Sequence, residues 1–295
     1  MSIKSTFYAK RWCALWLTGQ VLLTVTGCLP LPTRPRPTFP TQASTLPAAP
    51  EHLTLGNPTE ANQAEVNNYL VNKPQYSLSF NQSRGIANWV SWHLSPEWRG
   101  AAPRSKSFRP DPDLPAGLSS ARPSDYERTG FDRGHLCPSE DRDSSPADNA
   151  ATFVLSNVVP QAPKFNRETW KYLEEYARKQ VEQGNEVYLV AGPDGVGGTG
   201  EAGYATSVGA SKITVPAALW KVLLIMPLGT DDLNRITPNT TVVAVYIPNN
   251  QSVDNQPWSR YRLSVNELEA KIGLRFFTNL PPDVQAGLKR QTSGN

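Results

Sequence analysis

A proline-rich segment near the N-terminus separates the part of the chain that can build a folded core from the part that cannot. Seven prolines occur in the 22 residues 29–50, with Thr, Ser and Ala between them. Such a composition favours extended polyproline II, which has no internal hydrogen bonds and buries little surface. We therefore expect a tether at 28–54, one folded domain at 55–290 and a short tail at 291–295.

The residues before this tether have the pattern of an export signal. Three basic residues and no acid precede an apolar stretch, 12–25, that is short for a membrane span. The stretch leads into Thr-Gly-Cys28, which resembles the lipidation signal of bacterial lipoproteins. We predict a lipoprotein-type signal peptide at 1–27, a lipid anchor on Cys28, and export to the periplasmic or extracellular side of a bacterial membrane. A plain secretory signal and an uncleaved anchor remain the alternatives.

The composition indicates a globular protein whose net charge gives no reason to expect nucleic-acid binding. Hydrophobic residues make up 39% of the 295-residue chain, and charged residues make up 19%. The chain has 29 Lys and Arg against 26 Asp and Glu, and the three extra basic residues all lie in the signal segment. Three cysteines give neither a disulfide framework nor a paired-cysteine zinc site. Any contact with nucleic acid must therefore come from a local site.

The spacing of apolar residues predicts one α+β domain with a mostly antiparallel sheet. Dense Val, Ile, Leu and Tyr favour strands at 88–94, 152–159, 186–191, 213–226 and 242–247.

Two helices and a long loop complete the predicted domain. Trp170, Leu173, Ala177 and Val181 share one face of a predicted helix over 166–183. A capping box, Ser264-Val-Asn-Glu267, opens a second helix that Gly273 closes. Residues 95–130 are rich in Pro, Arg and Asp and lack a sustained period, so we expect an ordered loop there.

The chain has only three histidines, His52, His93 and His135. The candidate catalytic residue is His135. The sequence has no His-Glu-x-x-His, Cys-x-x-Cys, Gly-x-Ser-x-Gly or P-loop motif. His135 ends the run Asp132-Arg-Gly-His, in which glycine permits a bend that places an imidazole beside a guanidinium. An imidazole accepts a proton from water near neutral pH, and a guanidinium binds phosphate through two hydrogen bonds. These four residues alone do not separate a catalytic histidine from a structural one.

A longer, ordered set of segments resembles the DNA/RNA non-specific endonuclease family, which includes secreted bacterial sugar-non-specific nucleases and mitochondrial endonuclease G. The resemblance covers most of residues 75–290 in order. It rests on Arg104-Ser-Lys-Ser-Phe108-Arg-Pro-Asp111, on Asp132-Arg-Gly-His135, on the segment from Asn157 through Asn166 to Glu174, on Val190-Ala-Gly-Pro193, on Val215-Pro216 with Trp220-Lys221, and on the Ser264–Gly273 helix.

The resemblance implies a ββα-metal finger and a phosphodiesterase that uses one divalent metal ion. His135 would be the general base, and Asn166 the one direct protein ligand of the metal. Glu174 would act on the metal through water, while Arg104 and Arg133 would offset charge in the transition state. The implied cofactor is Mg²⁺, with Mn²⁺ as a substitute, because Mg²⁺ keeps several waters. The implied substrates are single- and double-stranded DNA and RNA, and the products carry 5′-phosphates.

Read without the family, several of these residues have other roles. Asn166 could be a helix N-cap, and Lys106 and Arg109 compete with Arg104 for the phosphate. We expect Asp132 to stabilise the finger and to take no part in the reaction, because two acidic residues beside the metal would repel the substrate.

Two other functions remain open at this point. A metal-independent ribonuclease could use His93 and His135 as acid and base, and it would require the ribose 2′-hydroxyl. A non-catalytic, surface-anchored nucleic-acid-binding protein could keep the fold without the activity.

Overall fold

The computed structural model describes residues 51–118, 121–253 and 256–292. The predicted signal peptide, Cys28 and the tether up to residue 50 lie outside the described residues. Glu51–Leu53 forms a short 3-10 turn, η1, in which His52 and Leu53 are buried. The folded body therefore includes residues 51–54, which the sequence assigned to the tether. No helix in the described part of the chain is long and apolar enough to cross a lipid bilayer.

A seven-stranded sheet forms the centre of the protein. Its strand order is β1-β2-β3-β6-β11-β12-β13, and every neighbouring pair is antiparallel. This confirms the predicted α+β class with a mostly antiparallel sheet. The strands are β1 Tyr69–Asn72, β2 Ser77–Asn81, β3 Ile86–Leu94, β6 Asn185–Asp194, β11 Ala218–Pro227, β12 Thr241–Pro248 and β13 Arg262–Leu263.

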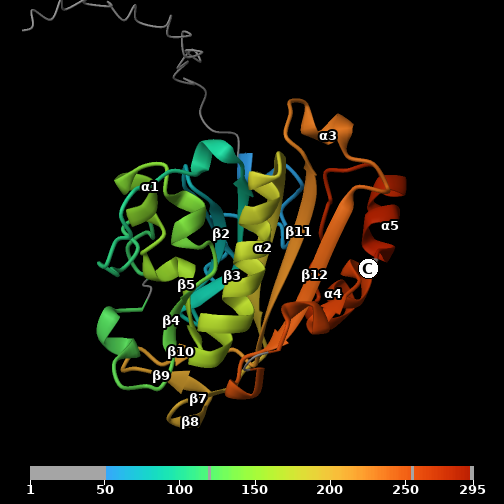
Figure 1. Ribbon diagram of the computed structural model, residues 1–295. Helices are drawn as coiled ribbons and strands as arrows, with labels where there is room; N and C mark the ends of the chain where they lie inside the picture. The colour runs from blue at the N-terminus through green and yellow to red at the C-terminus, as the bar shows by residue number, and fades with distance from the viewer. Residues whose placement is uncertain (1–50, 119–120, 254–255, 293–295) are drawn as a thin grey trace, which may run out of the picture. The chain divides into compact units, whose positions relative to one another are not determined.

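Side chains that alternate along the strands build one core on each face of this sheet. Leu223 of β11 belongs to the core under helix α2 (Lys171–Glu182), and its neighbour Val222 belongs to the opposite core. That second core lies under α4 (Val265–Ile272) and α5 (Pro282–Arg290). Figure 1 shows α2 in front of the sheet and α4 and α5 beyond its other face.

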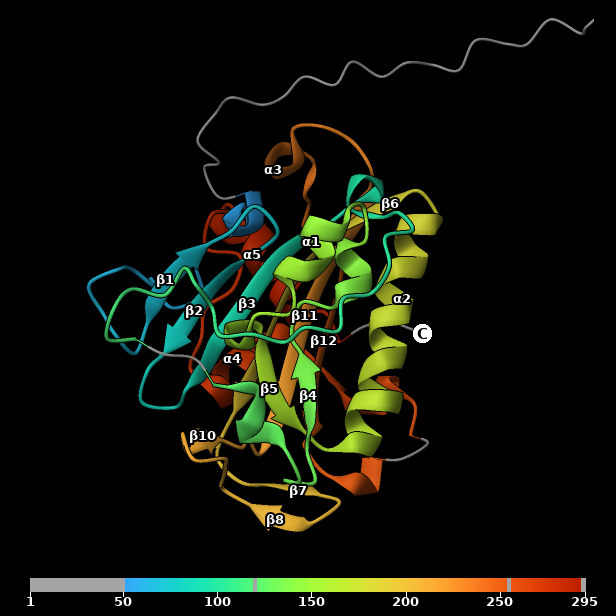
Figure 2. The ribbon, with the colours of Figure 1, turned by 90° about the vertical axis from the view of Figure 1, so that its left-hand side faces the viewer.

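A separate two-stranded unit lies on the α2 side of the sheet. Strand β4 (Asp132–His135) pairs antiparallel with β5 (Val158–Gln161). Figure 2 shows both strands in front of the central sheet and beside α2. The helical segment η6 (Phe165–Trp170) follows β5 and runs directly into α2. These elements together form the predicted finger of two strands and a helix.

The remaining described elements are short connections. They are η2 Pro96–Trp98, η3 Pro123–Tyr126, η4 Ser139–Arg142, α1 Pro146–Ala151, η5 Leu155–Asn157, β7 Gly198–Gly200, β8 Gly203–Ala205, β9 Ser207–Val208, β10 Ile213–Thr214, α3 Asp232–Arg235, η7 Gln251–Val253 and η8 Trp258–Tyr261.

Two predicted strands are shorter than the sequence indicated. Within 152–159, residues Leu155–Asn157 form a 3-10 turn, so the strand begins only at Val158. Pro160 does not stop it, because this strand pairs on one side only and tolerates a missing amide hydrogen. The predicted strand 213–226 is divided into β10 and β11 by three residues around Pro216.

The predicted helices are confirmed, with one refinement. The face formed by Trp170, Leu173, Ala177 and Val181 is buried. The helix, however, begins with a π-helical turn at Phe165–Trp170 instead of a regular α-helical one. In α4, Ser264 and Glu267 form the capping box, and Gly273 ends the helix at a φ of 72°.

Candidate active site

The finger places His135 at the end of a short strand that depends on a glycine. Gly134 lies opposite Val159 in the β4–β5 pair, and a Cβ atom at this position would lie 2.1 Å from the side chain of Gln161. The absence of a Cβ atom at Gly134 therefore makes room for the Gln161 side chain. His135 follows directly and lines the same cavity as Asn166 at the start of the helix.

The imidazole of His135 lies in an aromatic pocket, and one of its ring nitrogens is buried there. Its ring centroid lies 5.3 Å from that of Phe108 and 4.8 Å from that of Phe153. The residue is only 7% exposed, and its Nε2 atom has no hydrogen-bond partner among the described residues. A buried polar atom without a partner is uncommon and points to a partner that arrives from outside the protein.

Burial also determines the charge of this histidine. Burial, and after it the nearby positive charge of Arg104, lowers the pKa of His135 to about 3. The imidazole is therefore neutral at neutral pH, the state in which a ring nitrogen can accept a proton.

Two arginines flank His135 on the same aromatic support. The guanidinium of Arg104 lies 5.1 Å from the ring of Phe153 and donates a hydrogen bond to Ser139 Oγ. The guanidinium of Arg133 lies 4.9 Å from the ring of Phe108. The two rings that enclose the imidazole thus also carry the two positive charges predicted to bind phosphate.

Asn166 is oriented by an aspartate of the finger. Its Nδ2 atom donates a hydrogen bond of 2.9 Å to Asp132 Oδ2. Arg167 holds the same carboxylate in a two-pronged contact, with Nε at 2.9 Å and Nη2 at 2.7 Å. The donor end of the amide is thereby fixed on Asp132, and its oxygen points away from the aspartate. Asn166 lies inside the π-helical turn, so the alternative role as a helix N-cap does not apply.

Glu174 lies one helical segment further along and is largely buried. Its side chain is 13% exposed, and its Oε1 atom lies 3.6 Å from the ammonium of Lys221. Burial raises the pKa of Glu174 to about 7, although the positive charges of Lys221 and Arg178 oppose the increase.

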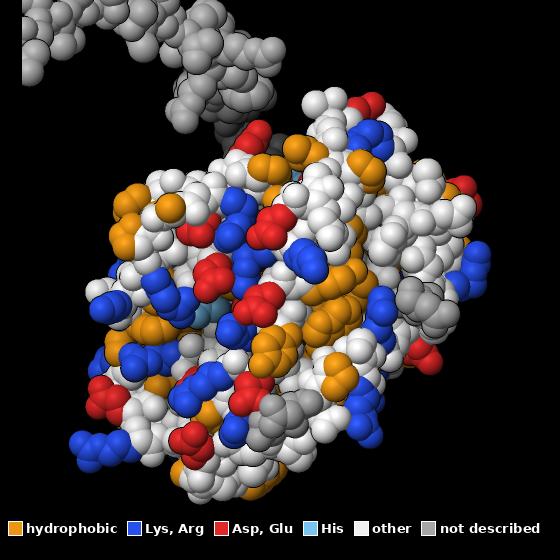
Figure 3. Space-filling view, in the orientation of Figure 1, with side chains coloured by type: hydrophobic (Ala, Val, Ile, Leu, Met, Phe, Trp, Pro, Cys, Tyr) orange, Lys and Arg blue, Asp and Glu red, His pale blue; other side chains and the backbone are white. Residues whose placement is uncertain are grey.

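One open cavity of about 350 Å³ brings these residues together. Its wall includes all five predicted site residues, which come from the 95–130 loop, β4, η6 and α2. Figure 3 shows basic and acidic side chains mixed over this side of the molecule. The cavity is lined by Arg104, Arg133, His135, Pro138, Ser139, Glu140, Asn166, Arg167, Lys171, Glu174 and Arg178.

Sequence reasoning missed several residues of this cavity. Arg167 follows Asn166 directly, and Arg178 lies one helical turn after Glu174, so helical spacing from the two predicted residues would have found Arg178. Arg178 pairs with Glu140 at 2.9 Å and with Asp141 at 3.1 Å. Lys106 and Arg109, which competed with Arg104 in the sequence, do not line the cavity.

Two further residues of the finger region have structural surroundings. Asn157 binds the backbone amide and the carbonyl of Cys137, each at 2.9 Å. Cys137 itself is fully buried, and burial raises the pKa of its thiol. Both features indicate structural roles for these two residues.

His93 does not share the cavity with His135. Its ring is stacked on Tyr188, whose side chain packs in the core of the opposite sheet face. Both of its ring nitrogens face carboxylates, with Nδ1 3.0 Å from Glu51 and Nε2 2.9 Å from Glu186. The two-histidine ribonuclease scheme requires both imidazoles in one site, and the structure does not bring them together.

His93 belongs to another group of metal-donor side chains. One ligand atom each from His93, Glu186 and Asp232 lies within 4.8 Å of the others. Both carboxylates of this group already pair with the guanidinium of Arg235, and Tyr188 donates to Asp232. The positive charge at this cluster is therefore supplied by the chain itself.

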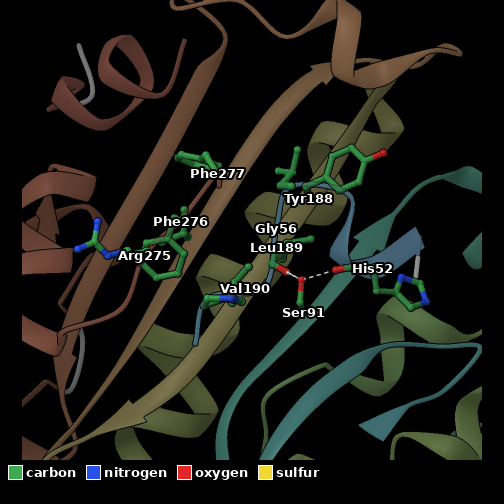
Figure 4. Close-up of a pocket in the computed structure, with 12 residues that line it drawn as sticks. His52, Gly56, Ser91, Tyr188, Leu189, Val190, Arg275, Phe276 and Phe277 are labelled. Atoms are coloured by element: carbon green, nitrogen blue, oxygen red, sulfur yellow. Dashed lines mark hydrogen bonds between the residues drawn. The ribbon is translucent and has the colours of Figure 1, made fainter. Parts of the chain in front are cut away.

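A small hollow lies near His52 and shares no lining residue with the cavity of His135. Figure 4 shows Ser91 at this hollow, where its hydroxyl donates to the backbone carbonyls of His52 and Leu189. The hollow has a volume of about 20 Å³, enough for one water molecule. It offers no room for a nucleotide.

Comparison with known proteins decides the family. The model of the DNA/RNA non-specific endonuclease family matches residues 55–283, which include the whole cavity. A protein named Nuclease from Nostoc sp. is 43% identical over 267 residues, covering 90% of this chain and 93% of that protein. The chain belongs to the DNA/RNA non-specific endonuclease family. It is a hydrolytic nuclease.

More distant proteins agree with this assignment. Mitochondrial nuclease EXOG from Danio rerio is 34% identical over 209 residues, which cover 69% of this nuclease and 59% of EXOG. A crystal structure of the EndoG/EndoGI complex matches 78% of this nuclease and 91% of the aligned chain, with a TM-score of 0.64 and 25% identity. The fold is thus similar to that in the EndoG/EndoGI structure, and the Nostoc and Danio rerio relatives are both named as nucleases.

Proposed function

We propose that this nuclease cleaves both DNA and RNA with one divalent cation, Mg²⁺ or in its place Mn²⁺, and leaves 5′-phosphates. The observation that carries the proposal is the pairing, in one cavity, of a buried unpartnered nitrogen on His135 with an oriented amide oxygen on Asn166. The first suits a proton acceptor and the second suits a hard metal ion.

The donor set of the cavity fits such a cation. Asn166 and Glu174 both supply oxygen atoms, the ligand type that Mg²⁺ prefers, and Glu174 is the only one of the two that carries charge. Asn166 would hold the cation directly, and Glu174 would hold water in its shell. When bound, the cation would offset charge on the phosphate and stabilise the leaving 3′-oxygen.

The other residues act on the water and the phosphate. Neutral His135 lines the cavity and accepts the proton of the attacking water. Arg104 and Arg133 bind the phosphate oxygens, and their charge stabilises the additional negative charge of the transition state. Asp132 fixes the amide of Asn166 and does not itself need to touch the substrate.

The charge balance of the segment that contains Arg104 and Arg133 bears on how strongly the nuclease prefers particular sequences. The segment 99–133 has seven basic and five acidic residues, a surplus of only two. Few phosphate contacts and few base contacts imply weak sequence preference.

We extend the proposal to location: export by the 1–27 signal, a lipid on Cys28, and a proline-rich tether that spans on the order of 70 Å when fully extended.

Cleavage of two substrates tests this function. Purified full-length protein is incubated with supercoiled plasmid and with structured RNA, each with Mg²⁺ and with a chelator, beside His135→Ala. We expect metal-dependent cleavage of both, lost in the variant. The fragments should accept a 5′-label from a kinase only after phosphatase treatment. Chelator-resistant cleavage of RNA alone would contradict the metal assignment and the proposed range.

A further inference from the structure

A lysine is buried directly behind the active-site cavity. Lys221 lies in β11, and its side chain is on the α2 face, between those of Leu219 and Leu223. The side chain is 0% exposed. Its Nζ atom makes no hydrogen bond to any residue within 51–118, 121–253 or 256–292. A charge in the middle of an apolar strand face is unusual, because ammonium groups lose their hydration when buried.

Two aromatic rings and one carboxylate surround this ammonium. Its Nζ lies 4.1 Å from the ring centroid of Trp170 and 5.5 Å from that of Trp92. The nearest carboxylate oxygen is Glu174 Oε1, at 3.6 Å. The rings attract the cation through their electron-rich faces without competing for the carboxylate. The ammonium is therefore held between β3 and the helix and directed at Glu174.

Packing alone does not explain a charge at this position. Apolar residues of similar volume in place of buried ion pairs are often neutral or stabilising. The other cation near Glu174 is Arg178, which already pairs with Glu140 and Asp141. Lys221 is therefore the fully buried cation that pairs with Glu174.

We propose that Lys221 is a positioning residue that fixes the carboxylate of Glu174 in the cavity wall. The ammonium holds Oε1 on the inner side, which leaves Oε2 for the water of the bound cation. The inference rests on the proposed role of Glu174 toward that water. It adds a residue that touches neither substrate nor metal and acts only through Glu174.

A double-mutant cycle tests this coupling. Lys221→Met, Glu174→Gln and the double variant are compared for cleavage of a defined duplex with Mg²⁺, for Mn²⁺ affinity by calorimetry, and for Tm. We expect Lys221→Met to lower kcat about 10- to 100-fold and to weaken Mn²⁺ binding, with KM for DNA within about twofold. The same substitution should have no further effect in the Glu174→Gln background. The Tm should stay equal or rise.

Lys73→Met is a matched control in another buried lysine. Lys73 pairs with Asp111 and Asp113 away from the cavity, so its loss should lower Tm and leave kcat per folded molecule unchanged. If Lys221→Met instead behaves like Lys73→Met, or if its effect on kcat adds fully to that of Glu174→Gln, the proposal is wrong.

Folding failure and failure of the proposed function give different results. If Lys221→Met does not fold by circular dichroism, Lys221→Gln goes through the same cycle. Failure of both to fold would contradict a positioning role, because the ammonium would then be needed for the fold itself. Chelator-resistant cleavage by the wild-type protein would overturn the proposed metal chemistry, whatever the Lys221 variants do.

Discussion

His135 and His93 are both buried histidines near carboxyl or arginine groups, but their surroundings differ in one decisive respect. Both ring nitrogens of His93 face carboxylates of the protein, at 3.0 and 2.9 Å. His135 lines the cavity, and its buried Nε2 atom has no partner among the described residues. A histidine whose contacts are complete stabilises the fold, whereas one with an open contact can serve a substrate.

The metal donors near the two histidines differ in the same way. Glu186 and Asp232, beside His93, are both paired with Arg235. Asn166, in the cavity of His135, has its donor end fixed on Asp132 and its oxygen directed away from that contact. Three potential metal ligands in one place are therefore a weaker indication of a metal site than one oriented oxygen beside an open histidine.

Replacing each histidine by alanine is expected to separate the two roles most strongly. His135→Ala should lower kcat about 10²- to 10⁴-fold, the usual contribution of a general base, and change stability little. His93→Ala should leave kcat within about twofold but lower the free energy of unfolding by about 1–3 kcal/mol, because the buried Oε2 atom of Glu186 loses its contact with His93. Plasmid cleavage rates and urea unfolding measure the two effects. A large loss of kcat in His93→Ala would contradict the structural role of His93.

The aspartates beside the two sites provide a smaller, parallel contrast. Asp132→Asn should lower kcat about 10- to 100-fold with Mg²⁺, because the substituted amide no longer fixes both Asn166 and Arg167. Asp232→Asn should leave kcat within about twofold, since Asp232 pairs with Arg235 and Tyr188 outside the cavity. Steady-state cleavage of one duplex compares them, and equal effects would show that the His93 cluster takes part in the reaction.

The pH dependence of stability gives the smallest expected effect. The pKa of His135 falls from its ordinary value near 6.5 to about 3, through burial and then through Arg104. The pKa of His52 falls to about 4, through burial and then through Arg142. Between these pH values and 6.5 the unfolded chain binds protons that the folded chain does not, so stability falls as the pH is lowered.

A leucine in place of His135 isolates its share of this pH dependence. Over pH 5 to 6.5, His135→Leu should reduce the slope of the unfolding free energy by up to about 1.4 kcal/mol per pH unit. Urea unfolding at several pH values measures the slope. An unchanged slope in His135→Leu would mean that the folded protein protonates His135 as readily as the unfolded chain does.

Elements with a strong apolar periodicity were predicted correctly from the sequence. Elements whose backbone geometry depends on distant contacts were not. The buried face of α2 and the capping box of α4 follow from spacing that local physics enforces. The 3-10 turn at Leu155–Asn157 could not be predicted, because apolar residues of a strand-like run lie on both sides of it and Asn157 is held by distant Cys137. The helix α5 was missed because it has few apolar positions, of which Val284 and Leu288 are buried.

The site was predicted from motif order, not from composition or periodicity. His135, Asn166 and Glu174 lie in segments that the family resemblance marks, and the fold brings them into one cavity. The contact of Asp132 with Asn166 joins residues 34 positions apart, so only the folded finger reveals it. Lys221 reads in the sequence as one polar residue in an apolar strand, and its approach to Glu174 depends on how α2 packs on the sheet.

Counting and locating the bound cation tests the central claim most directly. Calorimetric titration of Mn²⁺ into the purified protein is compared with titrations of Asn166→Ala and Asp232→Asn. We predict one ion per chain in the wild-type protein and in Asp232→Asn, with affinity at least about tenfold weaker in Asn166→Ala. Binding that persists in Asn166→Ala and is lost in Asp232→Asn would place the metal at the His93 cluster and contradict the assignment of the cavity.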